Sequence, residues 1–182
     1  SAITGRRFSG VPHWQPAGFQ DGTPMREVYG ESDWPLLLVS QKSVLVNAYV
    51  IGADRLRGIH PNNPVAIHPE DAAQFGLRTG DQVRIATPGG ETVATAIIRH
   101  GVMKGVVGIE HGFGHTEFGA RAHVLNGQRQ AERPALSAGV NINTLGVHDP
   151  SRRLGPGLWL DPVSGTAVRQ GIPARIAAVR AA

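Results

Sequence analysis

Short apolar runs between polar turns dominate the pattern along this chain. Each run is too short for an exposed helix and is bounded by turn residues, which is typical of a buried strand. Three such runs are Leu36–Val39, Val65–Ile67 and Val106–Ile109. Apolar and polar residues also alternate over Gln82–Thr87 and Glu91–Arg99, on either side of a Pro-Gly-Gly turn, which predicts a β-hairpin. The chain is therefore predicted to be mainly β.

One short helix is predicted over Pro69–Phe75. Proline loses no hydrogen bond at the first helical position, and the two acidic residues after it favour the positive end of the helix dipole. Gly76 is a helix-stop residue. We therefore interpret His68 as the residue that starts this helix rather than as a ligand.

Two stretches lack a sustained period. Residues 1–35 contain four Pro and five Gly, which predicts an extended arm on the surface. We expect Trp14, Phe19 and Trp34 to pin this arm by simple packing. Residues 116–138 are polar and carry several helix and strand breakers, which predicts a long surface loop with room for one short helix.

The last part of the chain is predicted to complete a barrel. Gly139–Leu145 alternates Asn with small apolar residues, so an extended backbone would place Asn141 and Asn143 on one face. Asp161–Gly165 has a turn signature, and a last strand is predicted over Ala174–Val179. If this strand closes onto the first ones, the barrel has few free edges.

Composition permits a packed core and excludes several kinds of chemistry. With 182 residues, 41% hydrophobic and 18% charged, the chain suits one folded domain, and its 24 Gly and 13 Pro favour a loop-rich β fold. No run of about 18 apolar residues is present, so no direct membrane insertion is expected. The sequence has no Cys, which removes disulfides, iron–sulfur ligation and thiol catalysis from this chain.

Positive charge is concentrated after Ala120. Eight Arg and three acids there give a net charge of +5, whereas ten basic and eleven acidic residues up to that point give −1, for a total of +4. Arginine suits bidentate contacts with phosphate or carboxylate. However, the arginines are not interleaved with aromatic residues, which make up only 5% of the chain. We therefore favour a solvated basic surface and expect no nucleic-acid partner.

Two polar loops at predicted strand ends are candidate binding sites. Residues 40–43 (Ser-Gln-Lys-Ser) directly follow the first buried strand, and such a strand end is suited to binding phosphate or carboxylate. An ordinary polar turn is the alternative. His111-Gly-Phe-Gly-His115 follows the third buried strand, and its glycines let the backbone approach a ligand and expose successive N–H groups.

We predict no metal site at His111 and His115. Residues four apart share a face only in a helix, which the two glycines between them oppose, and neither Cys nor an acidic cluster lies nearby. Hydrogen bonding to phosphate or to the edge of a heterocycle is favoured. Asn141 and Asn143 would offer donor and acceptor pairs to a base or pterin edge, or alternatively satisfy loop carbonyls.

The order of these motifs resembles a known domain. The motifs are the polar strand end, NPVAIHPEDAAQFGLRTGDQVRI, VVGIEHGFGH, GVNINTL and DPVSG, and they cover Leu36 to Val179. Together they resemble the C-terminal molybdopterin-dinucleotide-binding domain of the DMSO-reductase superfamily of molybdenum or tungsten oxidoreductases. The segments FSGVPHW and DPVSGTAVRQGIPARI are most similar to catalytic subunits of the tetrathionate-reductase type. This finer similarity implies a small sulfur oxyanion such as tetrathionate as the substrate.

The resemblance implies a six-stranded double-psi β-barrel with short peripheral helices and an extended N-terminal arm. Residues 36–182 would form the barrel domain and residues 1–35 the arm. The cofactor implied is bis-molybdopterin guanine dinucleotide. The positions that match its binding residues are Ser40, Gln41, Lys42, Ser43, Asn47, His111, Gly112, Phe113, His115, Asn141, Asn143 and Gln170.

These residues are expected to differ in their roles. The His111–His115 loop and the Asn pair would hold the pterin, whereas Lys42 and the amides of residues 40–43 would offset the pyrophosphate charge. Phe113 stands where the family usually has Trp, and Asn47 lies near a position often held by His. No catalytic residue is assigned, because the family's metal ligand and iron–sulfur cysteines belong to other domains.

The resemblance also implies that this chain works as part of a larger catalytic subunit. The expected partners are the N-terminal domains of the same polypeptide, together with an iron–sulfur electron-transfer subunit. A periplasmic location is expected, with a cytoplasmic one as the alternative. By itself the chain is expected to fold without cofactor and to have no activity. The competing hypothesis is a free-standing double-psi barrel that serves as a protein-interaction or substrate-recognition module.

Overall fold

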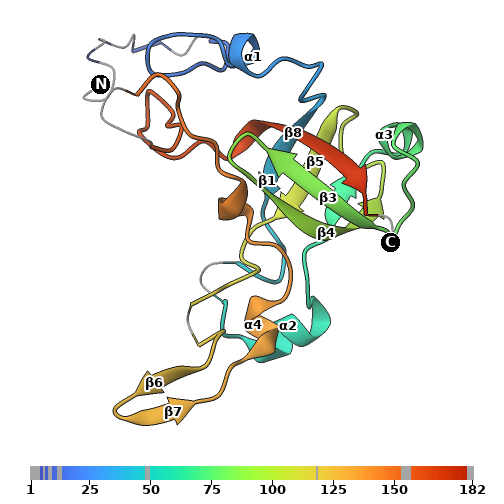
Figure 1. Cartoon of the computed structure of the whole chain (residues 1–182), viewed down its shortest axis with the longest axis vertical. Coiled ribbons are helices and arrows are strands. Elements are labelled where there is room, and N and C mark those ends of the chain that lie inside the picture. The colour runs from blue at the N-terminus through green and yellow to red at the C-terminus, as the bar shows by residue number, and fades with distance from the viewer. Residues whose placement is uncertain are drawn as a thin grey trace.

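A closed six-stranded barrel forms the centre of the molecule (Figure 1). The structure is a computed structural model that describes residues 5, 7, 10–11, 14–47, 50–117, 119–152 and 157–179. The barrel order is β1-β5-β2-β4-β3-β8. Its strands are β1 (Leu36–Gln41), β2 (Val65–Ile67), β3 (Gln82–Thr87), β4 (Gly90–Ile98), β5 (Val106–Glu110) and β8 (Gln170–Ala178). The predicted mainly β fold with a six-stranded barrel is confirmed.

Two pairs of barrel strands are parallel, β1 with β5 and β2 with β4. The β3–β4 hairpin is antiparallel as predicted, and β8 closes the barrel by antiparallel pairing with both β1 and β3. Parallel neighbours need crossover connections, which periodicity along the sequence does not reveal. Here the crossovers agree with the topology that the resemblance implies.

These pairings collect six strand termini at one end of the barrel. The ends of β1, β3 and β5 lie there together with the starts of β2, β4 and β8. We call this the site end, because it carries the loops that leave Gln41 and Glu110. The opposite end carries α3 (Pro69–Gln74), drawn on the right in Figure 1.

Alternation along the strands fills the barrel with aliphatic side chains. Because successive side chains of a strand point to opposite faces, every second residue faces inward. Inward residues with no exposed surface are Leu38, Val65, Ile67, Val83, Ile85, Val107, Ile109 and Ala174. Burial of each large aliphatic side chain contributes about 1.5–3 kcal/mol. This core holds the site end in a fixed geometry.

The predicted helix is confirmed, with the start that the sequence indicates. Nδ1 of His68 accepts a hydrogen bond from the N–H of Glu70 at 3.3 Å, which caps α3. Gly76 follows the helix in the left-handed region, with φ of 65°. The other short helices are α1 (Met25–Val28), α2 (Asp54–Ile59), α4 (Pro134–Ser137) and the 3-10 helix η1 (Ile142–Leu145). None of the helices in the described ranges is long and apolar enough to cross a membrane.

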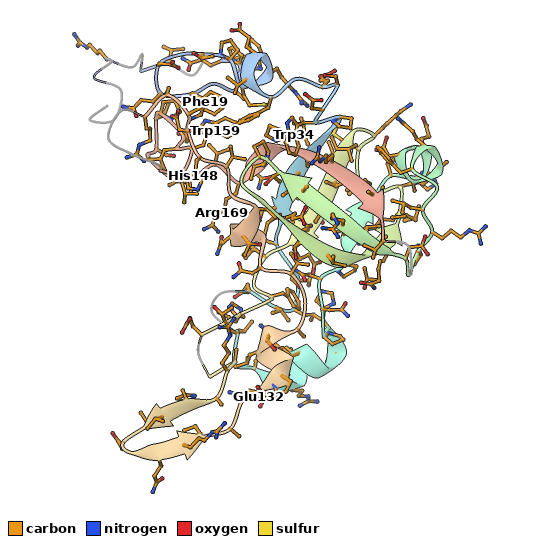
Figure 2. The ribbon with its side chains drawn as sticks, viewed as in Figure 1. Phe19, Trp34, Glu132, His148, Trp159 and Arg169 are labelled. Carbon is orange, nitrogen blue, oxygen red and sulfur yellow. The ribbon has the colours of Figure 1, made fainter. Side chains whose placement is uncertain are left out.

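Two of the three aromatic residues expected to pin the N-terminal arm, Phe19 and Trp34, are packed against the rest of the protein. Trp14 is 85% exposed, so its predicted anchoring role is wrong. Phe19 is buried against Trp159, with ring centroids 5.3 Å apart, and Trp34 lies under the guanidinium of Arg175 (Figure 2). The partners of the arm are therefore the segment before β8 and β8 itself. Phe8, Ser9, Pro12 and His13 of the FSGVPHW segment lie outside the described residues.

The segment over residues 116–138 is more structured than a loop. It contains a hairpin of β6 (His123–Leu125) and β7 (Gln128–Gln130), which points away from the barrel in Figure 1, followed by α4. The hairpin turns at Asn126-Gly127, with φ of 50° and 78°. Asn-Gly between strands is the strongest short hairpin signal, because both residues tolerate positive φ, so the sequence carried this information.

The last strand begins earlier than predicted, at Gln170 instead of Ala174. Proline is usually found in edge strands, because it has no backbone N–H to donate to a neighbouring strand. Here Pro173 is buried inside β8 and lies opposite Leu37. The pairing of β1 with β8 shifts register close to this position, because Leu38 lies opposite Ile172 and Val39 opposite Gln170.

Candidate functional site

Parallel pairing of β1 with β5 brings the two candidate loops together. Gln41 lies opposite Glu110, and the N–H of His111 donates to the carbonyl of Gln41 at 3.0 Å. The start of β8 joins them, since Nε2 of Gln170 donates to the carbonyl of Ser40 at 2.9 Å. Three segments that are far apart in the sequence thus meet at the site end, as their predicted common role requires.

The loop after β1 uses part of its polar groups to hold its own shape. Oγ of Ser43 accepts hydrogen bonds from the N–H groups of Leu45 and Val46, at 3.2 and 3.1 Å. The N–H of Ser40 donates to the carbonyl of Arg169 at 3.1 Å. These three amides therefore already have protein acceptors. Lys42 is exposed, so its ammonium group is placed to meet an anion.

Gln41 lies over a neighbouring strand instead of extending into solvent. A Cβ added at Gly108 of β5 would be 2.4 Å from Nε2 of Gln41, so only glycine leaves room for this side chain. Gln41 is half-buried. Gly108 therefore leaves the space in which the carboxamide of Gln41 lies at the site end.

Glycines allow the His111–His115 loop to pack closely on two other segments. Gly112 has φ of 95°, and a Cβ there would be 3.4 Å from Cα of Asn47. Gly114 has φ of 64°, and its N–H donates to the carbonyl of Ala138 at 2.9 Å. The N–H of His115 donates to the carbonyl of Leu136 at 3.0 Å. The loop is therefore an ordered part of the site end.

The side chains of this loop have different contacts and therefore different roles. Nε2 of His115 lies 3.0 Å from the carbonyl oxygen of Gly112, so His115 helps to close the loop. Phe113 is 2% exposed and packs edge-on against His60 at 5.4 Å between ring centroids. Its buried ring packs inside the protein and supports the loop. His111, which is half-buried, is the remaining side chain of the loop that can face a ligand.

The prediction of an extended Asn141–Asn143 segment is wrong. Oδ1 of Asn141 accepts the N–H of Asn143 at 3.1 Å and caps η1. Ile142 and Leu145 are buried, and this burial turns the backbone into a helical turn. The two Asn side chains therefore do not share a strand face. Asn143 is exposed, whereas Asn141 serves the backbone.

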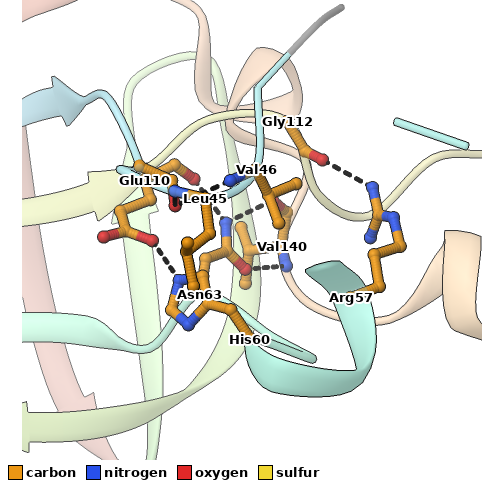
Figure 3. Close-up of polar contacts among 9 residues, drawn as sticks. Leu45, Val46, Arg57, His60, Asn63, Glu110, Gly112 and Val140 are labelled. Atoms are coloured by element: carbon orange, nitrogen blue, oxygen red, sulfur yellow. Dashed lines mark hydrogen bonds and ion pairs between the residues drawn. The ribbon is translucent and has the colours of Figure 1, made fainter. Parts of the chain in front are cut away.

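Sequence reasoning missed the buried polar residues that organise the site end (Figure 3). The guanidinium of Arg57 donates to the carbonyls of Ile51, Gly112 and Ala135 at 2.8, 2.8 and 3.2 Å. Its side chain also lies over the ring of Phe113, 5.2 Å from the centroid. Burial lowers the pKa of Arg57, and nearby Asp54 acts in the opposite direction. No periodic signal marks such a residue.

Asn63 and the His60–Glu110 pair complete this network. Nδ2 of Asn63 donates to the carbonyls of Glu110 and Val140, at 2.6 and 2.9 Å, while its Oδ1 accepts the N–H of Val140 at 2.7 Å. Nε2 of His60 lies 2.5 Å from Oε2 of Glu110. The only sequence hint was the position of Asn63, immediately before Pro64 and the buried strand β2.

The site end carries groups that are suited to binding by hydrogen bonds. Within the described ranges, no three His, Cys, Asp or Glu side chains gather closely enough to hold a metal ion. The groups that converge are carboxamides, imidazoles, glycine backbone and one Lys, which suit a polar ligand with heterocycles and phosphate.

Comparison with known proteins decides the family. Residues 43–153 match the family described as "Molydopterin dinucleotide binding domain". The matched range begins at Ser43, in the loop after β1, and includes the His111–His115 loop and η1. This chain belongs to the molybdopterin dinucleotide-binding domain family. The resemblance inferred from the motifs is thereby confirmed.

Relatives of this domain are subunits of oxidoreductases. The chain is 47% identical to the A subunit of tetrathionate reductase from Salmonella typhimurium, over 96% of the chain and 17% of that protein. It is 36% identical to ArrA, the molybdopterin-containing subunit of arsenate respiratory reductase from a Shewanella species, over 62% of the chain and 13% of that protein. The chain therefore spans less than a fifth of the length of these relatives.

A solved structure shares the fold. Acetylene hydratase from Pelobacter acetylenicus matches 92% of the chain, and 21% of its own chain, with a TM-score of 0.62 and 19% sequence identity. At this identity the match supports the architecture alone. The likeness to the oxidoreductase subunits rests on the sequence comparisons.

The residues of the molybdopterin dinucleotide-binding domain fit its cofactor. Gly112 and Gly114 let the loop pack closely on Asn47 and Asn141, which holds the loop that carries His111 in place at the site end. The carboxamide of Asn143 and the ammonium of Lys42 are exposed. A carboxamide matches the donor and acceptor edge of a pterin or guanine, and an ammonium matches a pyrophosphate.

Proposed function

We propose that this domain binds a molybdopterin guanine dinucleotide at the site end of its barrel, within a catalytic subunit that reacts with a small sulfur oxyanion such as tetrathionate. The observation that carries the proposal is the meeting of the β1 loop, the His111–His115 loop, η1 and Gln170 at one barrel end. The 47% identity to the tetrathionate reductase of Salmonella typhimurium supports the substrate class.

Each group at the site end has a binding role in this proposal. His111 and Asn143 hydrogen-bond the pterin, and Lys42 offsets the charge of the pyrophosphate. Gln41, Ser40 and the other residues of the polar loop shape the pocket wall. When bound, the cofactor supplies the redox-active metal, molybdenum or tungsten, whereas the domain binds and orients it.

We further propose the setting in which the domain works. Other domains of the same subunit enclose the remaining surface of the cofactor, since the chain covers only 17% of the Salmonella relative. An iron–sulfur subunit delivers electrons, and the assembly lies in the periplasm. The isolated domain folds but binds no cofactor. A large dinucleotide that is held from one side only loses most of its contacts.

The proposal is tested with His111→Ala and Asn143→Ala in the complete enzyme. Each variant removes hydrogen bonds that hold the cofactor, so we expect a loss of cofactor occupancy by about tenfold at limiting cofactor, equivalent to about 1.4 kcal/mol. Occupancy is measured as metal and extracted pterin per protein.

Arg78→Ala is the matched control. Arg78 is exposed, like Asn143, and lies in the turn at the barrel end opposite the site end, so its loss removes a polar side chain far from the proposed cofactor. We expect full occupancy in this variant. Full metal and pterin content in both site variants would contradict the proposal.

A further inference from the structure

Asn63 connects the two segments that carry the proposed pterin-binding side chains. Its Nδ2 donates to the carbonyl of Glu110, which directly precedes His111, at 2.6 Å. Its Nδ2 and Oδ1 also hold both the carbonyl and the N–H of Val140, which directly precedes Asn141. One side chain thus links the end of β5 to the segment before η1, and its two partners lie 47 and 77 residues from it in the sequence.

The connection requires a neutral carboxamide. Asn63 is 2% exposed, and its two N–H groups and its oxygen all meet backbone partners. An Asp of the same shape keeps the acceptor but turns a carboxylate oxygen toward two carbonyl oxygens. A Leu of similar size leaves three backbone groups without their partner, and unpaired buried polar groups are costly.

The surrounding backbone leaves space for this side chain. Gly139 has φ of 83°, and a Cβ there would lie 2.3 Å from Oδ1 of Asn63. The same Cβ would lie 3.0 Å from Cβ of Phe113. The chain thus uses a glycine, in a left-handed conformation, at the point where the carboxamide enters between the two segments.

We propose that Asn63 is a positioning residue for the dinucleotide, which sets the spacing between the His111–His115 loop and the Asn141–Asn143 segment. This inference rests on the proposed function of the site end. Asn63 acts through its neighbours, because its own polar atoms are engaged by Glu110 and Val140. Its three buried hydrogen bonds add to the contacts of Gly114 and His115 with Ala138 and Leu136, and so help to hold the two donor sets in register.

Arg57 has a different part in the same network. Its guanidinium ties Gly112 to Ala135 and Ile51, which fixes the loop against α4 and the start of α2. No contact of Arg57 reaches the backbone of residues 140–143 among those that the described structure shows. Of these two buried polar side chains, Asn63 is therefore the one that ties the end of β5 to the segment before η1.

The test uses Asn63→Asp and Asn63→Leu in the complete, cofactor-loaded enzyme. Loss of a residue that orients ligand-binding groups typically costs tenfold to a hundredfold in affinity, so we expect at least about a tenfold loss of pterin and metal content at limiting cofactor. In the enzyme that still carries cofactor, we expect an altered EPR line shape of the one-electron-reduced metal centre, Mo(V) or W(V). Amide hydrogen exchange is expected to rise at residues 110–115 and 138–143, but not in β3 and β4.

Asp71→Asn is the matched control for burial. Asp71 is 3% exposed, and its Oδ2 accepts the N–H of Gly105 at 2.7 Å, at the barrel end opposite the site end. This variant perturbs a buried polar contact without touching the site. We expect an unchanged EPR line shape and faster exchange near Gly105 only.

The outcomes separate this inference from the proposed function. If His111→Ala and Asn143→Ala lower cofactor content but both Asn63 variants keep wild-type content and line shape, the positioning role is wrong and the cofactor site stands. Lower content with an unchanged line shape and faster exchange throughout the barrel also overturns it, because that pattern describes general destabilisation. If none of the four variants changes cofactor content, the proposed function itself fails.

Discussion

At the scale of single residues, glycines determine how closely the segments of the site end approach. A Cβ at Gly114 would lie 2.3 Å from the backbone nitrogen of Asn141, and a Cβ at Gly89 would lie 1.7 Å from the carbonyl oxygen of Gly146. Backbone atoms cannot yield as a flexible side chain can, so these positions exclude any larger residue. At both positions a loop of the barrel packs directly against the segment that contains η1.

Gly114→Ala is expected to lower both stability and cofactor content. The residue has φ of 64°, which alone costs an alanine about 1–2 kcal/mol, and the collision with Asn141 adds to this. Gly127→Ala is the control, because Gly127 has φ of 78° but no atom within 4 Å of the added Cβ. Thermal unfolding and pterin content are measured for both. Equal effects of the two substitutions would show that the close contact has no influence.

At the scale of elements, turns and caps connect the barrel to its loops. The Asp161–Gly165 turn precedes β8, and Oδ1 of Asp161 accepts the N–H groups of Ser164 and Val163 at 2.6 and 3.1 Å. The carboxylate thus replaces backbone partners that the turn does not provide. The predicted turn is confirmed, and its chemistry is visible in the sequence.

This turn is expected to make stability depend on pH. The hydrogen bond from the Ser164 N–H lowers the pKa of Asp161 below its ordinary value of 3.8, so its charged form is favoured in the folded state. The stabilisation, about 1 kcal/mol, is present above that ordinary value and is lost as the pH falls through the lowered pKa. Denaturant unfolding is compared for the wild type and Asp161→Asn from about pH 2.5 to about pH 7. A constant difference between the two over this range would contradict the assignment.

At the scale of the whole molecule, the arm joins the segment before β8. Nε1 of Trp159 donates to the carbonyl of Gly18 at 2.8 Å, and Oδ2 of Asp149 accepts the N–H of Gln20 at 2.9 Å. Phe19 lies between Trp159 and Tyr29, and their cluster is continuous with the barrel core. The arm is therefore part of the folded unit.

Phe19→Ala is expected to release the arm from this cluster. Removal of a buried Phe costs about 3–5 kcal/mol, and the loss is expected to appear locally as faster amide exchange at residues 17–25 and 147–160. Trp14→Ala is the matched aromatic control, since Trp14 is 85% exposed and its loss is expected to change stability by less than about 0.5 kcal/mol. Exchange that rises equally in both variants would show that burial of Phe19 does not hold the arm.

The sequence by itself determined the features that depend on neighbouring residues. Short apolar runs marked β1, β2 and β5, alternation marked the β3–β4 hairpin, and Pro69 with Gly76 bounded α3. The motifs also indicated the family and the loop that its cofactor would need. These signals are local, because strand period, helix caps and turn conformations are set by residues a few positions apart.

Only the tertiary structure decided which distant segments of the chain pack against each other. The parallel pairing of β1 with β5 placed Gln41 next to Glu110, and burial of Ile142 and Leu145 turned the Asn141–Asn143 segment into η1. The importance of Asn63 was equally hidden, since a buried polar side chain is defined by partners far away in the sequence. Pairing between distant segments and the need to satisfy buried polar groups are properties of the assembled fold, and no local pattern encodes them.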